Sequence, residues 1–213
     1  MFSGNTVFTF SCLAALVNYS ATSAVGFLLS LYLQYTRGFG PERAGLVLIA
    51  APVMQAVMSP LAGRMSDRVE PRIVASLGMG LTVAGLVVLT FIGPGTPLAL
   101  IVASLLLLGI GFGLFSSPNM NAIMSSVEQR CYGVAGSMLA TVRMVGQMLS
   151  MGIVMLLFAL LIGNVEIPAA SAASFLVSMR VAFVVFALLC FGGVFASLSR
   201  GRLHATCATE GDS

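Results

Sequence analysis

The sequence predicts an all-α integral membrane protein with six transmembrane helices. Of its 213 residues, 58% are hydrophobic and 8% are charged, whereas a typical soluble domain carries about 25% charged residues. The mean hydropathy of +1.03 applies to the whole chain, not to one segment. Six apolar stretches of about 20 residues, the length that crosses roughly 30 Å of hydrocarbon, can be separated at charges and Gly/Pro clusters. They lack the alternation over about 10 residues that barrel strands show.

Charges and helix-breaking residues set the limits of each helix. The first stretch closes at Arg37 and Pro41. The Gly-Pro-Gly-Thr-Pro run at 93–97 forces a turn that separates the third stretch from the fourth. A membrane domain is therefore expected over 1–200, and a polar, disordered cytoplasmic tail over 201–213. The helices are expected at about 7–35, 44–62, 73–91, 98–115, 132–161 and 181–199.

The distribution of arginines predicts the orientation in the membrane. All ten basic residues are arginine, and nine of them lie between or beyond the apolar stretches. Positive charge in short loops is retained on the cytoplasmic side. One side collects six arginines (Arg64, Arg68, Arg72, Arg130, Arg200 and Arg202) and the other three (Arg37, Arg43 and Arg180). We therefore expect a multi-pass protein of the plasma or inner membrane with both termini in the cytoplasm, and we expect no nucleic-acid partner.

The residues needed for catalysis inside the membrane are missing from the apolar stretches. Every acidic residue lies in a loop or the tail, and the single histidine, His204, follows the last helix. No carboxylate pair or Ser–His pair can be assembled at depth. The four cysteines are scattered without a C-x-x-C spacing, which argues against a metal site. The sequence thus predicts no enzyme activity, no metal and no cofactor.

Arg143 is the one charge predicted at depth, in the fifth helix. A guanidinium facing lipid costs at least about 2.5 kcal/mol, so Arg143 must face protein or water. Arg143 and four small or polar residues of the fifth helix follow one another at spacings of three or four, so all five share one helical face. Two interpretations stay open. In the first, Arg143 binds an anionic group or holds a gate, with Gln147 as its hydrogen-bonding neighbour. In the second, Arg143 is a structural tie to backbone carbonyls or to a carboxylate on a missing helix. The other members of this face are Gly136, Ala140 and Ser150.

The first helix carries a second polar stripe. Core packing through small residues is favoured over substrate contact here, because membrane helices use the same residue types for both. Asn18 and Thr22 are nevertheless candidates for a substrate cavity, together with Asn119 and Asn121 after the fourth helix. The G-x-x-x-G at 109–113 is interpreted as a helix contact. The stripe consists of Ser11, Ala15, Asn18, Thr22 and Gly26.

A loop of five charges, Gly-Arg-Met-Ser-Asp-Arg-Val-Glu-Pro-Arg, joins the second and third helices at 63–72. It resembles the loop signature of the major facilitator superfamily, G-x-L-[small]-D-R-x-G-R-[KR]. Glu70 and Pro71 depart from the family's Gly-Arg, as second-half copies of the motif often do. Four residues match the signature: Gly63, Asp67, Arg68 and the basic Arg72. Met65 stands for the usual Leu. Together with Arg64, the four matching residues form a predicted cytoplasmic gate motif.

The resemblance extends over essentially the whole chain. Ser-Ser-Pro-Asn-Met-Asn at 116–121, Gly-Val-Ala at 133–135 and Arg143-x-x-x-Gln147 are similar to the second half of the fourteen-helix drug/proton antiporter branch. The resemblance implies the C-terminal six-helix half of a major-facilitator fold, with the pathway between two halves. It also implies that Asp67 takes part in a charge network that joins the halves on the cytoplasmic side.

The leading hypothesis is secondary transport of small molecules by alternating access, as drug/proton antiport-like efflux with protons as coupling ion. It requires an N-terminal half or a homodimer partner. We favour a fragment of a longer product, because Met1 falls almost at the start of a membrane helix. The alternative is a truncated non-transporting protein or a modulatory helical subunit.

Overall fold

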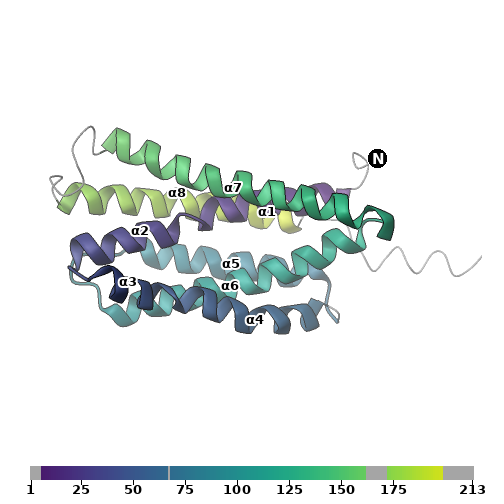
Figure 1. Cartoon of the computed structure of the whole chain (residues 1–213), viewed down its shortest axis with the longest axis horizontal. Coiled ribbons are helices and arrows are strands. Elements are labelled where there is room, and N and C mark those ends of the chain that lie inside the picture. The colour runs from purple at the N-terminus through teal and green to yellow at the C-terminus, as the bar shows by residue number, and fades with distance from the viewer. Residues whose placement is uncertain (1–5, 67, 162–171, 199–213) are drawn as a thin grey trace, which may run out of the picture.

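The computed structural model describes residues 6–66, 68–161 and 172–198, and this part of the chain is helical without strands. Six of its helical runs are long and apolar enough to cross a membrane. The predicted all-α membrane fold is therefore confirmed (Figure 1). The elements are α1 (Thr6–Thr22), α2 (Val25–Leu31), the π-helix η1 (Tyr32–Thr36), α3 (Pro41–Leu48), α4 (Ala50–Ser66), α5 (Pro71–Thr90), α6 (Leu98–Ser125), the 3-10 helix η2 (Gln129–Cys131), α7 (Tyr132–Leu161) and α8 (Ala172–Leu198).

The second helix, expected at 44–62, is divided into α3 and α4, which together extend from Pro41 to Ser66. The largest differences from the sequence expectation are the end of α6 and the start of α8. α6 continues to Ser125 instead of stopping at 115, because the end of the apolar run does not end the helix; in its last turn the Ser125 hydroxyl donates to the Asn121 carbonyl at 2.8 Å. α8 begins at Ala172 instead of 181, so Arg180 lies inside a helix and not in a loop. A long side chain can sit on a membrane helix and reach a polar group near its end, and Arg180 Nε donates to the Ile92 carbonyl at 2.8 Å.

The first membrane span is interrupted between α1 and α2 without a proline. The hydroxyls of Thr22 and Ser23 donate to the carbonyls of Asn18 and Tyr19, at 2.8 and 2.7 Å. Such back-bonding competes with the helical ladder and bends helices. The backbone N–H of Ala24 then donates to the Ser150 hydroxyl of α7 at 2.9 Å. A side chain from another helix thus supplies the acceptor at the interruption.

Glycines bring α6 close to both α4 and α5. A Cβ on Gly78 of α5 would lie 2.6 Å from the Gly111 carbonyl of α6. On the opposite side, a Cβ on Gly109 would meet the Ala51 carbonyl, and one on Gly113 would lie 2.9 Å from Met58 Cβ of α4. The G-x-x-x-G is therefore a helix contact, as predicted.

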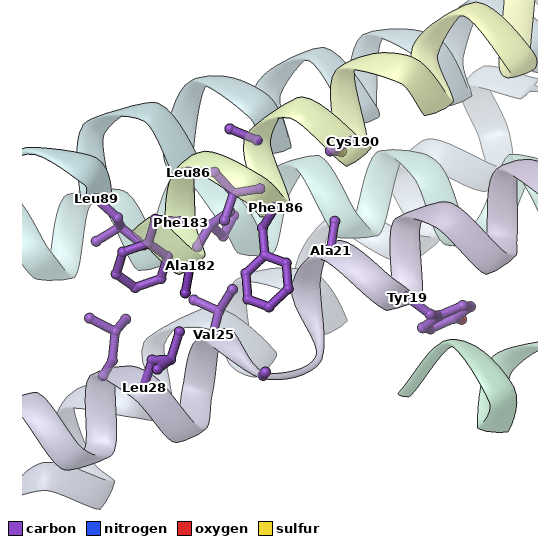
Figure 2. Packing of buried hydrophobic residues seen from close by; sticks show 14 of the residues in the cluster. Tyr19, Ala21, Val25, Leu28, Leu86, Leu89, Ala182, Phe183, Phe186 and Cys190 are labelled. Atoms are coloured by element: carbon purple, nitrogen blue, oxygen red, sulfur yellow. The ribbon is translucent and has the colours of Figure 1, made fainter. Parts of the chain in front are cut away.

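A large hydrophobic cluster joins α1, α2, α5 and α8 near the interruption (Figure 2). Phe183 and Phe186 of α8 are fully buried there, with Leu86 of α5 and Leu28 of α2. Figure 2 shows the Phe186 ring beside Val25, where the chain passes from α1 to α2. The packed aromatic side chains fix the direction in which α2 leaves the bend.

The turn between α5 and α6 is fastened by three long-range hydrogen bonds. The Tyr32 hydroxyl donates to the Gly93 carbonyl at 2.7 Å, and Arg37 Nη1 donates to the Pro94 carbonyl at 2.9 Å. Arg180 supplies the third bond, to Ile92. The first span, the turn and α8 are thus joined at this end of the bundle.

α4 and α7 form the two edges of the bundle (Figure 1). α4 packs on α6, whereas α7 packs mainly on α1. In the most apolar window of each span, 6% of the residues are buried in the span that contains α4 and 22% in the span that contains α7, against half or more in the other four. These two helices therefore present long apolar faces to lipid or to other protein.

Candidate substrate cavity and loop motif

A cavity of about 450 Å³ lies between α4 and α7, where α1 meets α6. This volume falls in the range of about 300–1,000 Å³ that is typical of small-molecule sites. Most of the wall is apolar, with a few polar groups and one charge. The lining residues are Tyr19, Thr22, Ser23, Val25, Gly26, Leu48, Ala51, Pro52, Gln55, Leu105, Leu108, Gly109, Phe112, Arg143 and Gln147.

Arg143 is the charge in this cavity, and its guanidinium lies over an aromatic ring. Its Cζ atom is 5.0 Å from the centroid of the Tyr19 ring. The Tyr19 ring in turn meets Phe112 of α6 edge-on, with centroids 5.4 Å apart and an interplanar angle of 71°. A cation–π contact stabilises the charge by about 0.5–2 kcal/mol, which offsets part of the cost of about 2.5–3.5 kcal/mol for an arginine at the centre of a membrane helix.

Close packing between α1 and α7 brings Tyr19 under Arg143. A Cβ on Gly146 would lie 2.8 Å from Tyr19 Cβ and 3.0 Å from the Leu16 carbonyl. Figure 2 shows Tyr19 on α1 directed toward α7. Because residues three apart share a helical face, Arg143 lies on the same side of α7 as Gly146. The glycine contact thus sets the position of the guanidinium above the ring.

Polar side chains from three helices complete the cavity wall. Gln147 lies one turn after Arg143 on α7 and is exposed, as is Arg143 itself. Gln55 of α4 and Thr22 at the end of α1 also line the cavity. The Thr22 hydroxyl is already bonded to the Asn18 carbonyl. The two glutamine amides and the guanidinium therefore supply the polar groups that can turn to a bound molecule.

The loop motif lies at the far end of α4 and is tied to α6. The Ser66 hydroxyl donates to the Gly63 carbonyl at 2.8 Å, and the Asn121 amide of α6 donates to Ser66 Oγ at 2.9 Å. A Cβ on Gly63 of α4 would lie 3.1 Å from Ser117 Oγ of α6. The glycine of the motif thus permits close approach of α4 to α6.

Two arginines of the motif line a second cleft, of about 650 Å³. Arg64 and Arg68 are exposed and line it with apolar side chains of α4 and α6. Arg72 is at the second residue of α5, after Pro71 at the first. Asp67 lies outside the described residues. The positive charges of the motif therefore gather at one end of the bundle.

A family model described as Major Facilitator Superfamily matches residues 11–205. The chain belongs to this superfamily. Membership in a superfamily of transporters confirms the prediction that the chain is not an enzyme. Together with the six apolar helices, it confirms a multi-pass membrane protein that forms one six-helix bundle of the major-facilitator fold.

Several curated transporters of the superfamily are similar to this chain. The Riboflavin transporter RibZ of Clostridioides difficile (strain 630) is 32% identical over 139 residues, which cover 65% of this chain and 30% of that protein. The Lincomycin resistance protein LmrB of Listeria monocytogenes is 28% identical over 156 residues, covering 66% of this chain and 33% of that protein. The Multidrug efflux pump LfrA of Mycolicibacterium smegmatis is 24% identical over 163 residues, covering 76% and 32%. The aligned part of the chain spans about a third of the length of these relatives.

The structure separates the six candidate cavity residues of this superfamily member into three groups. Thr22, Arg143 and Gln147 line the cavity. Asn18 and Asn119 are buried at 0% and 2% exposure, and neither Asn18 amide atom has a hydrogen-bond partner among the described residues. Asn121 contacts the loop motif instead. The polar stripe of the first helix is therefore divided, with Ser11, Ala15 and Asn18 in the core and Thr22 and Gly26 at the cavity.

Sequence reasoning did not select Tyr19, Gln55 or Phe112 as cavity residues. Gln55 gave a usable signal, since it is an amide within an apolar span. Gln147 was selected for its position one turn after Arg143, and Gln55 has no such neighbour in the sequence. The two aromatic residues gave none, because aromatic side chains are common in the cores of membrane bundles. Only the packing of α1 on α7 identifies Tyr19 as the partner of Arg143.

Proposed function

We propose that this chain is one half of a secondary transporter that exports small molecules by alternating access, with drug/proton antiport-like exchange. The observation that carries the proposal is the cavity between the two edge helices α4 and α7. Among the described residues that line it, Arg143 is the one with a charged side chain. In transporters built from two repeats, substrate sites lie near the bilayer midplane at the interface between the repeats. The cavity lies between α4 and α7, which belong to the two least buried spans, so it would lie at such an interface if a second repeat packed on them.

The proposed activity requires a second six-helix unit. α4 and α7 are the least buried spans, and they flank the cavity. A partner placed against both helices would close the open side of the cavity, and it would be either an N-terminal half or a second copy of this chain. The two halves of major-facilitator transporters are related by an axis along the membrane normal, so both arrangements have the required symmetry.

We assign the loop motif to the cytoplasmic side of the plasma or inner membrane, with both termini on that side. The excess of arginine at this end of the bundle supports the orientation. The resemblance described above implies that Asp67, with Arg64 and Arg68, joins the two halves there. Rocking of the halves then exposes the cavity alternately to the two sides.

Efflux from cells tests the proposal. A panel of cationic, neutral and anionic fluorescent dyes is loaded into cells that express the protein, and the rate of loss is followed with and without a protonophore. We expect protonophore-sensitive efflux of at least one dye, and its loss in Asp67→Asn and Arg143→Ala at unchanged membrane abundance. Arg130→Ala is the matched control, because Arg130 is on the surface and pairs locally with Glu128, at 2.6 Å.

The outcomes separate the activity from the site assignments. Efflux that survives both substitutions would leave transport standing and contradict the assigned residues. If no dye moves under any gradient, the chain is not a transporter by itself, and a modulatory role on another membrane protein becomes the better interpretation.

A further inference from the structure

The charge in the cavity is positive and has no countercharge among the described residues around it. Arg143 is the only charged residue among those that line the cavity in the described part of the chain. Of the acidic residues that the structure describes, Glu42 lies in the first turn of α3, Glu70 directly precedes α5, and Glu128 pairs with Arg130. None of the three lines the cavity. Within the described chain, the guanidinium is thus uncompensated by a carboxylate.

The geometry around Arg143 leaves its hydrogen-bond donors available. One face of the guanidinium is covered by the Tyr19 ring, but a ring contact uses the π-face and not the N–H groups. A guanidinium presents five donors in a planar fork that matches the oxygens of carboxylate, sulfonate or phosphate groups. The side chain is exposed in the cavity, so these donors can meet a group that enters from the open side.

The same contact disfavours a cationic cargo. Aromatic faces are what usually attract a ligand cation in an apolar pocket, and here the Tyr19 face is occupied by the protein's own guanidinium. A second positive charge in this cavity would be repelled by Arg143, and repulsion is strong where water is partly excluded. The Phe112 ring makes an edge-to-face contact with the Tyr19 ring. The rest of the cavity wall is mostly aliphatic.

We infer that the cavity selects amphipathic molecules with an anionic group, which binds Arg143 while an apolar body packs against Phe112 and the leucines of α6. This inference rests on the proposed function, of which it names the substrate class. Gln55 and Gln147 face the cavity from opposite edges, and their amides supply secondary hydrogen bonds to the polar end. Tyr19 acts as a positioning residue, because it holds the guanidinium and does not itself need to touch the cargo.

Equilibrium binding of three matched probes tests the inference. The protein, as the cell makes it, is purified into nanodiscs of zwitterionic lipid and titrated with 2-naphthalenesulfonate, 2-naphthalenesulfonamide and (2-naphthylmethyl)trimethylammonium. The probes share one ring system and carry a fixed negative, zero and positive charge. We expect the sulfonate to bind at least about tenfold more tightly than the sulfonamide, since charge-assisted hydrogen bonds are roughly twice as strong as neutral ones, and the ammonium to bind most weakly.

Variants assign the preference to Arg143. Arg143→Gln should remove the preference for the sulfonate, Arg143→Lys should retain part of it, and Tyr19→Phe should retain it because the ring remains. Arg130→Gln is the control for a change in overall charge. Equal binding of the three probes, a preference for the ammonium, or a sulfonate preference that survives Arg143→Gln would each overturn the inference.

Two further measurements distinguish a transported anion from a bound lipid headgroup. Soluble dihexanoyl phosphatidylglycerol is added as a competitor of 2-naphthalenesulfonate. If the phosphatidylglycerol has the lower dissociation constant of the two, the site binds a lipid headgroup and the cargo assignment is overturned. Flux of the sulfonate into proteoliposomes is measured separately. Selective binding without flux under any gradient supports the site and contradicts the proposed transport, whereas flux of cations alone supports transport and contradicts the anionic cargo.

Discussion

At the scale of single residues, the position of Arg143 within a membrane helix could be predicted from the sequence, but the side chain that it contacts could not. An arginine within an apolar stretch must avoid lipid, and Arg143 does line a cavity. Its contact with Tyr19 depends on how α1 is rotated against α7, which the close approach at Gly146 determines. Ser150 shows the same limit of prediction. The sequence places Ser150 on a small polar face, but it does not show that the Ser150 hydroxyl accepts a hydrogen bond from the Ala24 N–H.

The Ser150 hydroxyl supplies an acceptor at the interruption of the first span. Ser150→Ala should leave the Ala24 N–H without its partner and lower the free energy of unfolding by about 1 kcal/mol. Ser137→Ala on the same helix should change it little, because Ser137 is exposed and its hydroxyl bonds the Val134 carbonyl within α7. Thermal unfolding in detergent compares the two variants. Equal effects would mean that the inter-helix bond does not stabilise the interruption.

At the scale of helices, the length of the apolar stretches and the charges and Gly/Pro clusters between them predicted six spans in the right order, but not their ends. α6 runs past Pro118 and a polar segment, and α8 includes Arg180. Polar residues beyond the hydrocarbon can continue a helix, and a long side chain such as that of Arg180 can reach a polar group in a neighbouring turn. Hydropathy marks the thickness of the membrane and does not by itself mark where a helix ends.

The contact between α5 and α6 offers a direct test of helix packing. In Gly78→Ala the new methyl would meet backbone atoms of Gly111, Leu114 and Phe115 within 2.9 Å, so the helices must separate. We expect a loss of about 1–3 kcal/mol in the free energy of unfolding. Gly80→Ala, two residues along the same helix, has nothing within 4 Å of the new methyl. This control should be neutral or slightly stabilising, because alanine favours helix; a similar loss in both variants would contradict the importance of close packing at Gly78.

For the whole molecule, the six-helix bundle could be predicted from the sequence, whereas the cavity required coordinates. Residues of α1, α4, α6 and α7 meet there although they are far apart in the chain. No periodic pattern encodes which helix faces meet. The position of the cavity at the open side of the bundle is what connects the fold with the proposed need for a second unit.

The proposed second unit predicts the size of the native assembly. The chain alone has a mass of 22.1 kDa. We expect a C-terminal tag on the chromosomal gene to reveal either a denatured band of roughly twice that mass or more, as for two fused repeats, or a 22.1 kDa band that is part of a larger complex in native mass analysis. A 22.1 kDa species that is monomeric and still transports would contradict the requirement for a second unit.

The pairing of Arg143 with Tyr19 also bears on how the protein is made. Proteins are synthesised from the N-terminus, so α1 enters the membrane well before α7 leaves the ribosome. The ring that covers the guanidinium is therefore already in the bilayer when the most costly residue of α7 arrives. Insertion of α7 by the translocon is thus expected to depend on the earlier helix, and the order of synthesis becomes part of what makes a charged membrane helix acceptable.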